Sequence, residues 1–427
     1  MGVRIAVVGG GSTYTPELVE GLATRSERLP VDELALLDPD RDRLEVVGGL
    51  ARRMLRRFDW PGSLVLTQDR EAAIEGADFV IVQLRVGGQA ARLVDETLPP
   101  TFGTIGQETT GAGGFAKALR TVPIVLELAE MTGRRAAPGA WLIDFTNPVG
   151  IVTQALLDAG HRAIGLCNVA IGYQRALARM LAVDPGRVTL EHVGLNHLSW
   201  VRAVWLDGVD VLPDLLEHDA RTLARMAGVP VAIVRRLRAI PSSYLRYYYQ
   251  TAHVLEQQRR RGTTRARTVM DIETQLLHLY RDERLAEKPA LLADRGGAFY
   301  SEAATQLMAS LHDGRGDLQV VDVRNDGALP DRSPDDVVEV TARIDREGAH
   351  PLRFRPLDVE EHDLVERVKA FERLTLEAAR TGERSTALRA LRANPLVGDG
   401  PESEPLLDAL LEANRQFLPQ FARPAAT

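Results

Sequence analysis

The feature that most constrains the fold is a regular alternation of strand and helix patterns that runs from the N-terminus to Cys167. It begins with the apolar run VRIAVV (3–8), which ends at a glycine triplet and is followed by a helical pattern from Pro16. The later strand patterns are ELALLD (33–38), SLVLTQD (63–69), DFVIVQL (78–84), AWLIDFT (140–146) and RAIGLC (162–167), with helices such as 41–58 and 115–131 between them. This alternation implies right-handed crossovers and a Rossmann-type, doubly wound parallel sheet.

Beyond Asp184 the pattern changes. The segment RVTLEHVGLNHLSWVRAVWLDG (187–208) has the pattern of two adjacent strands, and long helical stretches dominate from there to the C-terminus. A chain of 427 residues also exceeds what one hydrophobic core normally supports. We therefore predict an α/β Rossmann domain over residues 1–168 and a mixed α+β domain over residues 169–427.

Composition excludes several classes of partner. The net charge of −7 gives no basis for binding nucleic acid or an anionic membrane. No apolar run approaches the roughly 18 residues that span a bilayer, and the N-terminal strand leads directly into the glycine loop without a signal-peptide pattern. A single cysteine, Cys167, excludes an intrachain disulfide and fits a reducing compartment. We therefore expect a cytoplasmic protein.

The glycine loop has most of the residues expected of a dinucleotide site. A glycine turn between a first strand and a helix lets backbone amides approach a pyrophosphate at the helix N-terminus. Gly9 and Gly11 fit this fingerprint, whereas Tyr14 occupies its third glycine position. Asp38 ends the second strand, where its carboxylate would accept the ribose 2′-hydroxyl and repel a 2′-phosphate. The pattern favours NAD over NADP, the alternative being a tight turn and a surface aspartate.

Two ligand-type residues lie at predicted strand ends. Cys167 ends one strand and His197 lies between two others, and ligands bind at strand ends in an open parallel sheet. On spacing alone, a small buried cysteine and a satisfied core histidine are the commoner interpretations. Because two ligands fall short of a usual metal site, metal binding requires substrate hydroxyls and water to complete the coordination. A solvent-accessible thiolate ligand would also oxidise readily.

The segment PSSYLRYYYQ contains half of the eight tyrosines of the chain. Tyr244, Tyr247 and Tyr248 fall on one face of a helix, which is also the pattern of an aromatic packing stripe. A catalytic tyrosine would need nearby cations to pull its pKa from about 10 toward neutrality. Arg265 and a bound metal are the predicted sources of that field.

Arginines dominate the basic residues. Only three of the 52 are lysines (Lys117, Lys288 and Lys369), which we attribute to genome composition. Arg85, Arg92 and Arg265 are candidates for a phosphate clamp, because a guanidinium presents forked donors. For each of these arginines, a solvated surface position is the alternative.

Seven motifs taken in order resemble glycoside hydrolase family 4. They are GGGSTYTPEL, QLRVGGQAARLVDE, GQETTGAGGFAKALRTVP, DFTNPVG, GLCN, VGLNHL and PSSYLRYYY. The resemblance runs from the N-terminus to about residue 300, and Cys167-Asn168 is most similar to the 6-phospho-β-glucosidase branch. CNVAIG departs from the expected CN-x-P pattern, with Ala170 in place of proline, so the resemblance does not extend to the local shape of the sugar pocket. Family 4 is an NAD-dependent exception to two-carboxylate glycoside hydrolysis.

The resemblance implies a role for each motif. NAD would be held by Gly9, Gly10, Gly11, Ser12 and Asp38, and Mn²⁺ or another divalent metal by Cys167 and His197. Sugar hydroxyls would be bound by Asn147 and Asn168, and the rest of the substrate by Arg92, Arg265 and, at its phosphate, Arg85. Tyr244 would be the catalytic base, with Glu108 nearby to raise its basicity.

The implied reaction explains why these groups occur together. The proton on carbon 2 of a glycoside becomes acidic only after carbon 3 is oxidised by hydride transfer to NAD. The metal polarises the resulting ketone, Tyr244 removes the carbon-2 proton, and the aglycone leaves from carbon 1. Water then adds and the hydride returns, so NAD is not consumed. The predicted function is NAD- and Mn²⁺-dependent hydrolysis of 6-phospho-β-glucosides.

Three other functions share part of this pattern. A simple NAD-dependent hydroxy-acid dehydrogenase would share the first domain but would not need Cys167. A relative within the family could act on α-linked or unphosphorylated glycosides. A non-catalytic NAD sensor would not need Cys167, His197 and Tyr244 in matching motifs. The resemblance also implies a small sugar phosphate as substrate and a homodimer or homotetramer assembled by the C-terminal domain.

Overall fold

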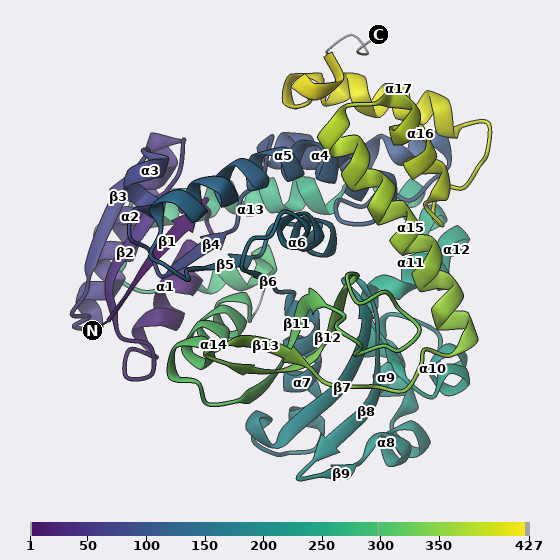
Figure 1. Ribbon diagram of the computed structural model, residues 1–427, viewed down its shortest axis with the longest axis horizontal. Helices are drawn as coiled ribbons and strands as arrows, with labels where there is room; N and C mark the ends of the chain where they lie inside the picture. The colour runs from purple at the N-terminus through teal and green to yellow at the C-terminus, as the bar shows by residue number, and fades with distance from the viewer. Residues whose placement is uncertain (1, 298, 423–427) are drawn as a thin grey trace.

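The fold is organised around a nine-stranded sheet. The computed structural model describes residues 2–297 and 299–422. Six parallel strands run in the order β3-β2-β1-β4-β5-β6, which is the Rossmann order. They are β1 (Val3–Val8), β2 (Val31–Leu37), β3 (Ser63–Thr67), β4 (Phe79–Val82), β5 (Trp141–Asp144) and β6 (Ala163–Gly165). The predicted Rossmann-type α/β fold is therefore confirmed (Figure 1).

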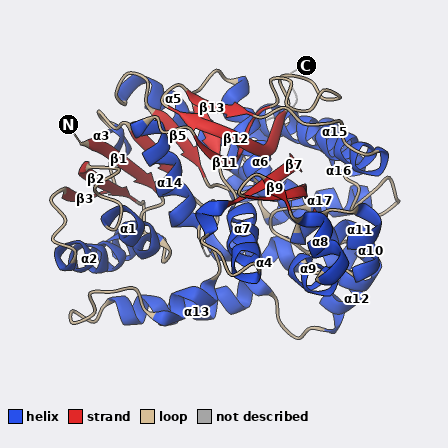
Figure 2. Ribbon diagram, turned by 90° about the horizontal axis from the view of Figure 1, so that it is seen from below, coloured by secondary structure: helices blue, strands red, loops and turns tan. Residues whose placement is uncertain are grey.

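Helices connect these strands and cover both faces of the sheet (Figure 2). They are α1 (Thr15–Ala23), α2 (Arg41–Arg57), α3 (Arg70–Ile74), α4 (Gly88–Thr97), α5 (Gly111–Arg135), α6 (Val149–Asp158) and α7 (Asn168–Met180). With both faces covered, the central strands are apolar throughout, as all four residues of β4 are buried. Asp40 caps α2 by accepting a hydrogen bond from the Arg43 amide at 3.1 Å, which explains where that helix begins.

Three strands from the second half of the chain extend the same sheet. They are β11 (Asp317–Arg324), β12 (Val337–Asp345) and β13 (Gly348–Pro351), all antiparallel to their neighbours. β11 joins β6 through one residue pair, Asp322 and Gly165. The prediction that helices dominate here was incomplete, because the β-branched runs in 317–345 favour strands. The division at residue 168 stays a prediction, although this sheet contains strands from both sides of it.

A smaller sheet lies in the second half of the chain. Its core is an antiparallel hairpin of β7 (Val188–Leu195) and β8 (Leu198–Leu206), which confirms the two adjacent strands predicted there. β9 (Val209–Asp210) and β10 (Ile240–Pro241) pair with β8. The hairpin turn is Asn196-His197, and His197 has a positive φ of 62°. This left-handed conformation is uncommon outside glycine, and asparagine, aspartate and histidine adopt it more often than other residues do.

The remaining helices surround the two sheets. They are α8 (Leu212–His218), α9 (Ala220–Ala227), α10 (Val231–Leu237), α11 (Arg246–Tyr249), α12 (Thr251–Arg260), α13 (Arg265–Tyr280), α14 (Tyr300–Asp313), α15 (Val359–Thr381), α16 (Arg384–Ala393) and α17 (Ser403–Ala413). The long helix α15 contacts both α5 and α16, so the C-terminal helices pack against the Rossmann half (Figure 1). Within the described residues, none of the helices combines the length and apolarity that crossing a bilayer requires.

Candidate active site

A cleft of about 1490 Å³ opens at the carboxyl ends of β1 and β4. The strand order reverses between these two strands, and ligands bind at such a reversal in open α/β sheets. The glycine loop and the segments after β2, β4 and β5 line one part of the cleft. Residues of the segments 243–247, 261–265 and 295–297 line another part. The cleft therefore joins the predicted dinucleotide loop to residues from the second half of the chain.

The glycine loop is fixed against the second strand. The Gly9 and Gly10 amides donate to the Leu37 carbonyl at 2.9 and 2.8 Å. Gly9 has a φ of +92°, and a Cβ there would lie 2.8 Å from the Gln83 carbonyl oxygen, so only glycine fits. A Cβ on Gly10 or Gly11 would collide with Leu36 or Asp38, because the loop packs directly on the end of β2.

Asp38 is oriented by this packing. Its Oδ2 accepts a hydrogen bond from the Gly11 amide at 3.0 Å, and its Oδ1 accepts one from the Asp40 amide at 3.0 Å. Asp38 lines the cleft together with Gly9 and Ser12. A carboxylate has about four lone-pair sites, so two remain for ribose hydroxyls. The predicted contacts of these residues with NAD remain predictions.

Tyr14, at the third glycine position, closes the loop from the other side. Its hydroxyl donates to the Gly297 carbonyl, and the Arg295 guanidinium lies 5.7 Å from the centre of its ring. Arg295 also donates to the Thr13 hydroxyl at 2.7 Å and to Glu273 at 2.9 Å. Tyr14, which replaces the third glycine of the fingerprint, thus joins the loop to residues 295–297.

Three cations surround the buried carboxylate of Glu108. Arg85 forms an ion pair with it, Arg92 lies 3.2 Å away, and the Lys117 ammonium lies 2.8 Å away. Burial alone would raise the pKa of Glu108, but these three cations hold it well below its ordinary value. Burial and the charge of Arg85 lower the pKa of Lys117 to about 7, despite the attraction of Glu108. Arg85 and Arg92 therefore form ion pairs with a carboxylate of the protein, which the prediction of a phosphate clamp did not include.

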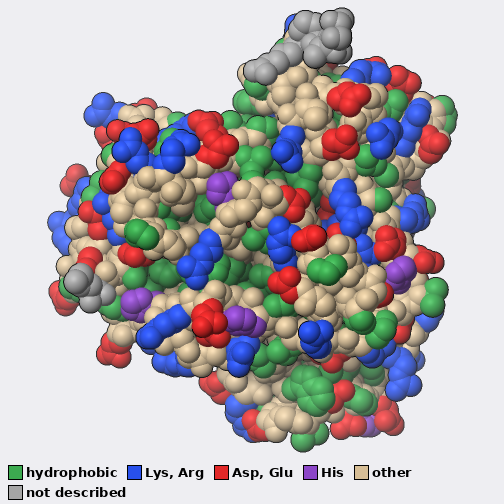
Figure 3. Space-filling model, viewed as in Figure 1, with side chains coloured by type: hydrophobic (Ala, Val, Ile, Leu, Met, Phe, Trp, Pro, Cys, Tyr) green, Lys and Arg blue, Asp and Glu red, His purple; other side chains and the backbone are tan. Residues whose placement is uncertain are grey.

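Arg265 is placed differently from the other two predicted arginines. It begins α13, is exposed at the mouth of the cleft, and donates to the Asp294 carbonyl at 2.7 Å. Nine basic side chains but only five acidic ones line the cleft, although the whole chain carries a net charge of −7. On the face shown in Figure 3, acidic and basic side chains are interspersed. The basic excess in the cleft favours an anionic ligand.

Tyr244 lines the cleft, and His197 packs against its ring. Their rings stack with centroids 3.7 Å apart and an interplanar angle of 13°. Burial raises the pKa of Tyr244 well above its ordinary value, as do the charges of Cys167, Tyr247 and Glu108. Arg265 is not among the main influences on this pKa, and none of those influences is a cation. Glu108 acts in the predicted direction, and its catalytic role stays a prediction.

Cys167 and His197 do not themselves line the cleft, but each is next to a residue that does. Cys167 precedes Asn168 and His197 stacks on Tyr244, both of which line the cleft. Cys167 is only 5% exposed, and burial and the charge of Glu339 raise its pKa well above the ordinary value. The expectation of a solvent-accessible thiolate is therefore wrong.

The chemistry of this pair fits a divalent metal. His197 Nδ1 is buried without a hydrogen-bond partner, while a backbone hydrogen bond with Thr109 engages the ring. Burial lowers the pKa of His197 to about 4, so the imidazole is neutral and able to ligate. The Cys167 sulfur has hydrogen bonds from the Val169 amide and the Asn196 side chain. Metal-binding sites commonly fix their ligands in this way.

Asn147 and Asn168 also line the cleft, as predicted for residues near the sugar. The Asn147 Oδ1 is buried without a partner, while its side chain has a hydrogen bond to Tyr300. Sequence reasoning missed Tyr300, Thr109, Lys117, Arg295 and Glu273. Of these, only Lys117 carried a signal, as one of three lysines in an arginine-rich chain.

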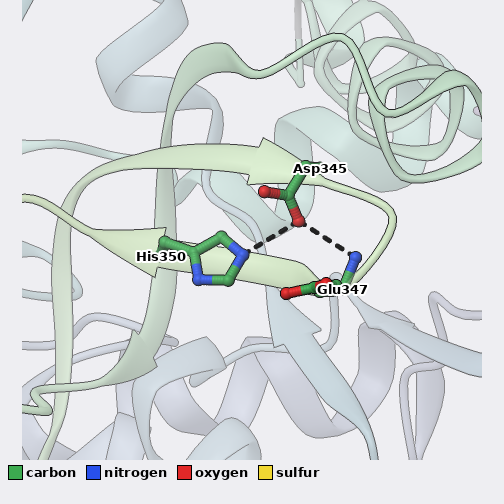
Figure 4. A group of neighbouring side chains, drawn as sticks. All are labelled: Asp345, Glu347 and His350. Atoms are coloured by element: carbon green, nitrogen blue, oxygen red, sulfur yellow. Dashed lines mark hydrogen bonds and ion pairs between the residues drawn. The ribbon is translucent and has the colours of Figure 1, made fainter.

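A second group of ligand-type residues lies elsewhere, on the hairpin between β12 and β13. Asp345 Oδ1 accepts hydrogen bonds from His350 Nε2 at 2.8 Å and from the Glu347 amide at 3.0 Å (Figure 4). Among groups of three or more such residues, it is the one that the described part of the chain brings within reach of a shared ion. Its hydrogen bonds stabilise the turn, and it is far in the sequence from every residue of the cleft.

Comparison with known proteins identifies the family. The sequence profile of the Family 4 glycosyl hydrolases matches residues 4–183, and the profile of the Family 4 glycosyl hydrolase C-terminal domain matches residues 192–397. The chain belongs to glycoside hydrolase family 4. The resemblance seen in the motifs is thereby confirmed, and it extends well beyond residue 300.

Relatives within family 4 cover nearly the whole chain. The probable 6-phospho-β-glucosidase of Bacillus subtilis (strain 168) is 42% identical over 98% of both chains. The 6-phospho-β-glucosidase of Thermotoga maritima, solved with manganese, NAD⁺ and glucose 6-phosphate, is 36% identical with a TM-score of 0.92, covering 97% of this chain and 99% of that one. A 6-phospho-α-glucosidase from gut microorganisms, solved with NAD and glucose 6-phosphate, is 27% identical with a TM-score of 0.90 over 98% and 99%.

Proposed function

We propose that this family 4 enzyme hydrolyses 6-phospho-β-glucosides with NAD and a divalent metal, Mn²⁺, as cofactors. One observation carries the proposal: a single basic cleft joins the glycine loop and Asp38 to the stacked Tyr244 and His197. The β-linkage follows from the relatives, because the two named 6-phospho-β-glucosidases are 42% and 36% identical and the α-glucosidase is 27% identical.

The glycine loop and Asp38 would hold NAD. When bound, NAD would supply a hydride acceptor for carbon 3 of the sugar. The N-terminus of α1, which follows the loop and has no side-chain cap, is suited to the pyrophosphate. The unused lone pairs of Asp38 are suited to the ribose hydroxyls, and its charge disfavours a 2′-phosphate.

Cys167 and His197 would hold the metal, with the substrate completing its coordination. When bound, the metal acts as a Lewis acid on the oxidised sugar. The unpartnered Nδ1 of His197 and the hydrogen-bonded sulfur of Cys167 support this assignment. Because the pKa of the thiol is raised, Cys167 must lose its proton as the cation binds.

The protein's own groups would bind the sugar and move one proton. The Tyr244 oxygen would take the carbon-2 proton. The stack of its ring on His197 and its hydrogen bond to Thr109, which hold the side chain, support this role. The buried, unpartnered Oδ1 of Asn147 is suited to accept a sugar hydroxyl. The exposed guanidinium of Arg265 is suited to the 6-phosphate at the mouth of the cleft.

Two finer statements belong to the same proposal. We propose that the enzyme works in the cytoplasm, where a reducing environment protects its one cysteine. We also propose a homodimer or homotetramer, which sedimentation of the purified protein would test.

A labelling experiment tests the proposed reaction. A phosphorylated aryl β-glucoside is hydrolysed in deuterated water with Mn²⁺ and catalytic NAD. We expect deuterium at carbon 2 of the released sugar phosphate and the original hydrogen at carbon 3. Product without deuterium at carbon 2, after correction for slow exchange, would contradict carbon-2 deprotonation. NADH formed in step with substrate loss would indicate a dehydrogenase, and preference for the α-anomer or the unphosphorylated glucoside would correct the substrate class.

A further inference from the structure

One buried carboxylate holds the hairpin that carries His197. Glu339 lies on β12 of the large sheet and is only 2% exposed. Its Oε2 is hydrogen-bonded to His192 Nε2 at 3.0 Å and accepts from the Ser199 hydroxyl at 2.9 Å. Its Oε1 accepts from Asn196 Nδ2 at 3.3 Å. These partners lie on β7, on β8 and in the turn between them, so Glu339 ties the whole hairpin end to the large sheet.

The same carboxylate is linked to Cys167 through Asn196. The Asn196 side chain bonds the Cys167 sulfur as well as Glu339. A primary amide has two N–H groups, so one side chain can serve the carboxylate and the sulfur together. Asn196 therefore links Glu339 to Cys167 by hydrogen bonds, and His197 follows Asn196 directly in the chain.

The position of His197 depends on such a tie. His197 has a positive φ, which residues other than glycine seldom adopt, and its Nδ1 has no hydrogen-bond partner. A strained backbone conformation persists when the surrounding structure imposes it. Here the surrounding structure is the set of hydrogen bonds from the hairpin to Glu339.

We propose that Glu339 is a positioning residue that sets the relative placement of Cys167 and His197 for a divalent cation. The proposal rests on the proposed function, since it assumes that these two residues bind the metal. Outer carboxylates of this kind typically change metal affinity by about 10- to 100-fold when they are removed.

Thr341 offers a matched control. It lies two residues along the same strand, and its hydroxyl accepts from the His192 amide at 3.2 Å and donates to the Leu190 carbonyl at 2.6 Å. Thr341 thus ties the same hairpin to the same strand without a hydrogen bond to Asn196. A merely structural role for Glu339 predicts that E339Q and T341V behave alike.

Cobalt binding separates the two roles. Chelator-treated full-length protein is titrated with Co²⁺, and the thiolate-to-cobalt absorption band and the Kd are recorded for wild type, C167S, E339Q and T341V, with Tm measured for each. We expect a band in the wild type that C167S abolishes, a Kd raised about 10- to 100-fold with an altered band in E339Q, and wild-type binding in T341V. N196D, which replaces the bridging amide, should weaken binding as E339Q does, and it decides the question if E339Q does not fold.

The two proposals fail in different ways. A normal wild-type band with unchanged affinity in both E339Q and N196D would overturn the role of Glu339 alone. Equal losses of Co²⁺ affinity in E339Q and T341V would show that Glu339 only stabilises the fold. A wild-type protein without a thiolate band would overturn the metal assignment, and the Glu339 proposal with it.

Discussion

Replacing Tyr244 with phenylalanine removes one oxygen from the site and little else. The ring is stacked on His197 at 3.7 Å, and phenylalanine fills the same space. The loss to stability is then one hydrogen bond to Thr109, or about 0.5–1.5 kcal/mol. Tyr248 is a matched control, because its hydroxyl is hydrogen-bonded at 2.9 Å to that of Thr110, the residue after Thr109. Y244F and Y248F should therefore lower the free energy of unfolding by similar amounts.

Their effects on catalysis should differ. A positioned base contributes about two to four orders of magnitude to turnover, which corresponds to about 3–5 kcal/mol of activation free energy. Y244F should lose kcat on that scale and also lose deuterium exchange at carbon 2. Y248F should keep most of both, because Tyr244 lines the cleft whereas Tyr248 does not.

The measurements are urea unfolding and steady-state turnover of a phosphorylated aryl β-glucoside for Y244F, Y247F and Y248F. Equal losses of stability with a loss of kcat only in Y244F would support the assignment. If Y247F or Y248F is the inactive variant and Y244F turns over normally, the wrong tyrosine has been chosen. If Y244F loses turnover but its stability falls far more than that of Y248F, the effect is on packing.

Three further predictions follow from the site. C167S and H197N should stay folded but lose Mn²⁺-dependent turnover. Asparagine is chosen at position 197 because it tolerates the positive φ found there. Wild-type turnover of C167S in the presence of chelator would refute the metal assignment. D38N should weaken NAD binding about 10- to 100-fold, because the ribose loses a charged hydrogen-bond acceptor. It should also reduce the preference for NAD over NADP, and calorimetry measures both affinities. The folded-state pKa of Lys117, about 7, lies below its unfolded value, so the unfolded chain binds more protons between pH 7 and 10. The free energy of unfolding of the wild type should therefore rise relative to that of K117M over this range, by at most about 1.4 kcal/mol per pH unit. A difference in urea unfolding that does not change with pH would show that Lys117 keeps its proton when folded.

Local patterns were sufficient to predict the parallel sheet. Each of β1 to β6 has an apolar run followed by a turn, and the glycine loop and Asp38 lie beside each other because their strands are neighbours. The antiparallel strands β11 to β13 were missed, although their β-branched runs favour strands. That β11 joins the parallel sheet could not be predicted, since its pairing with β6 joins residues more than 150 positions apart. Sequence spacing carries no information about such a contact.

The predicted site was right in its residues more than in their interactions. Arg85 and Arg92 line the cleft, but their pairing with Glu108 depends on how α4 and α5 pack. The scarcity of lysine was attributed to genome composition, yet Lys117 and Lys369 are both buried in ion pairs, at 2% and 1% exposure. An ammonium is smaller than a guanidinium and can lose its proton, so a rare lysine in an arginine-rich chain is informative.

The single residue pair between β6 and β11 has a consequence for synthesis on the ribosome. β6 is complete at Gly165, but its neighbour in the sheet begins only at Asp317. At about 5–20 residues per second, this interval of about 150 residues lasts roughly 8–30 s. During that time the nascent Rossmann half has an open strand edge, and Cys167 lies just beyond it. The brevity of β6, three residues long, limits what that edge can pair with in a crowded cell.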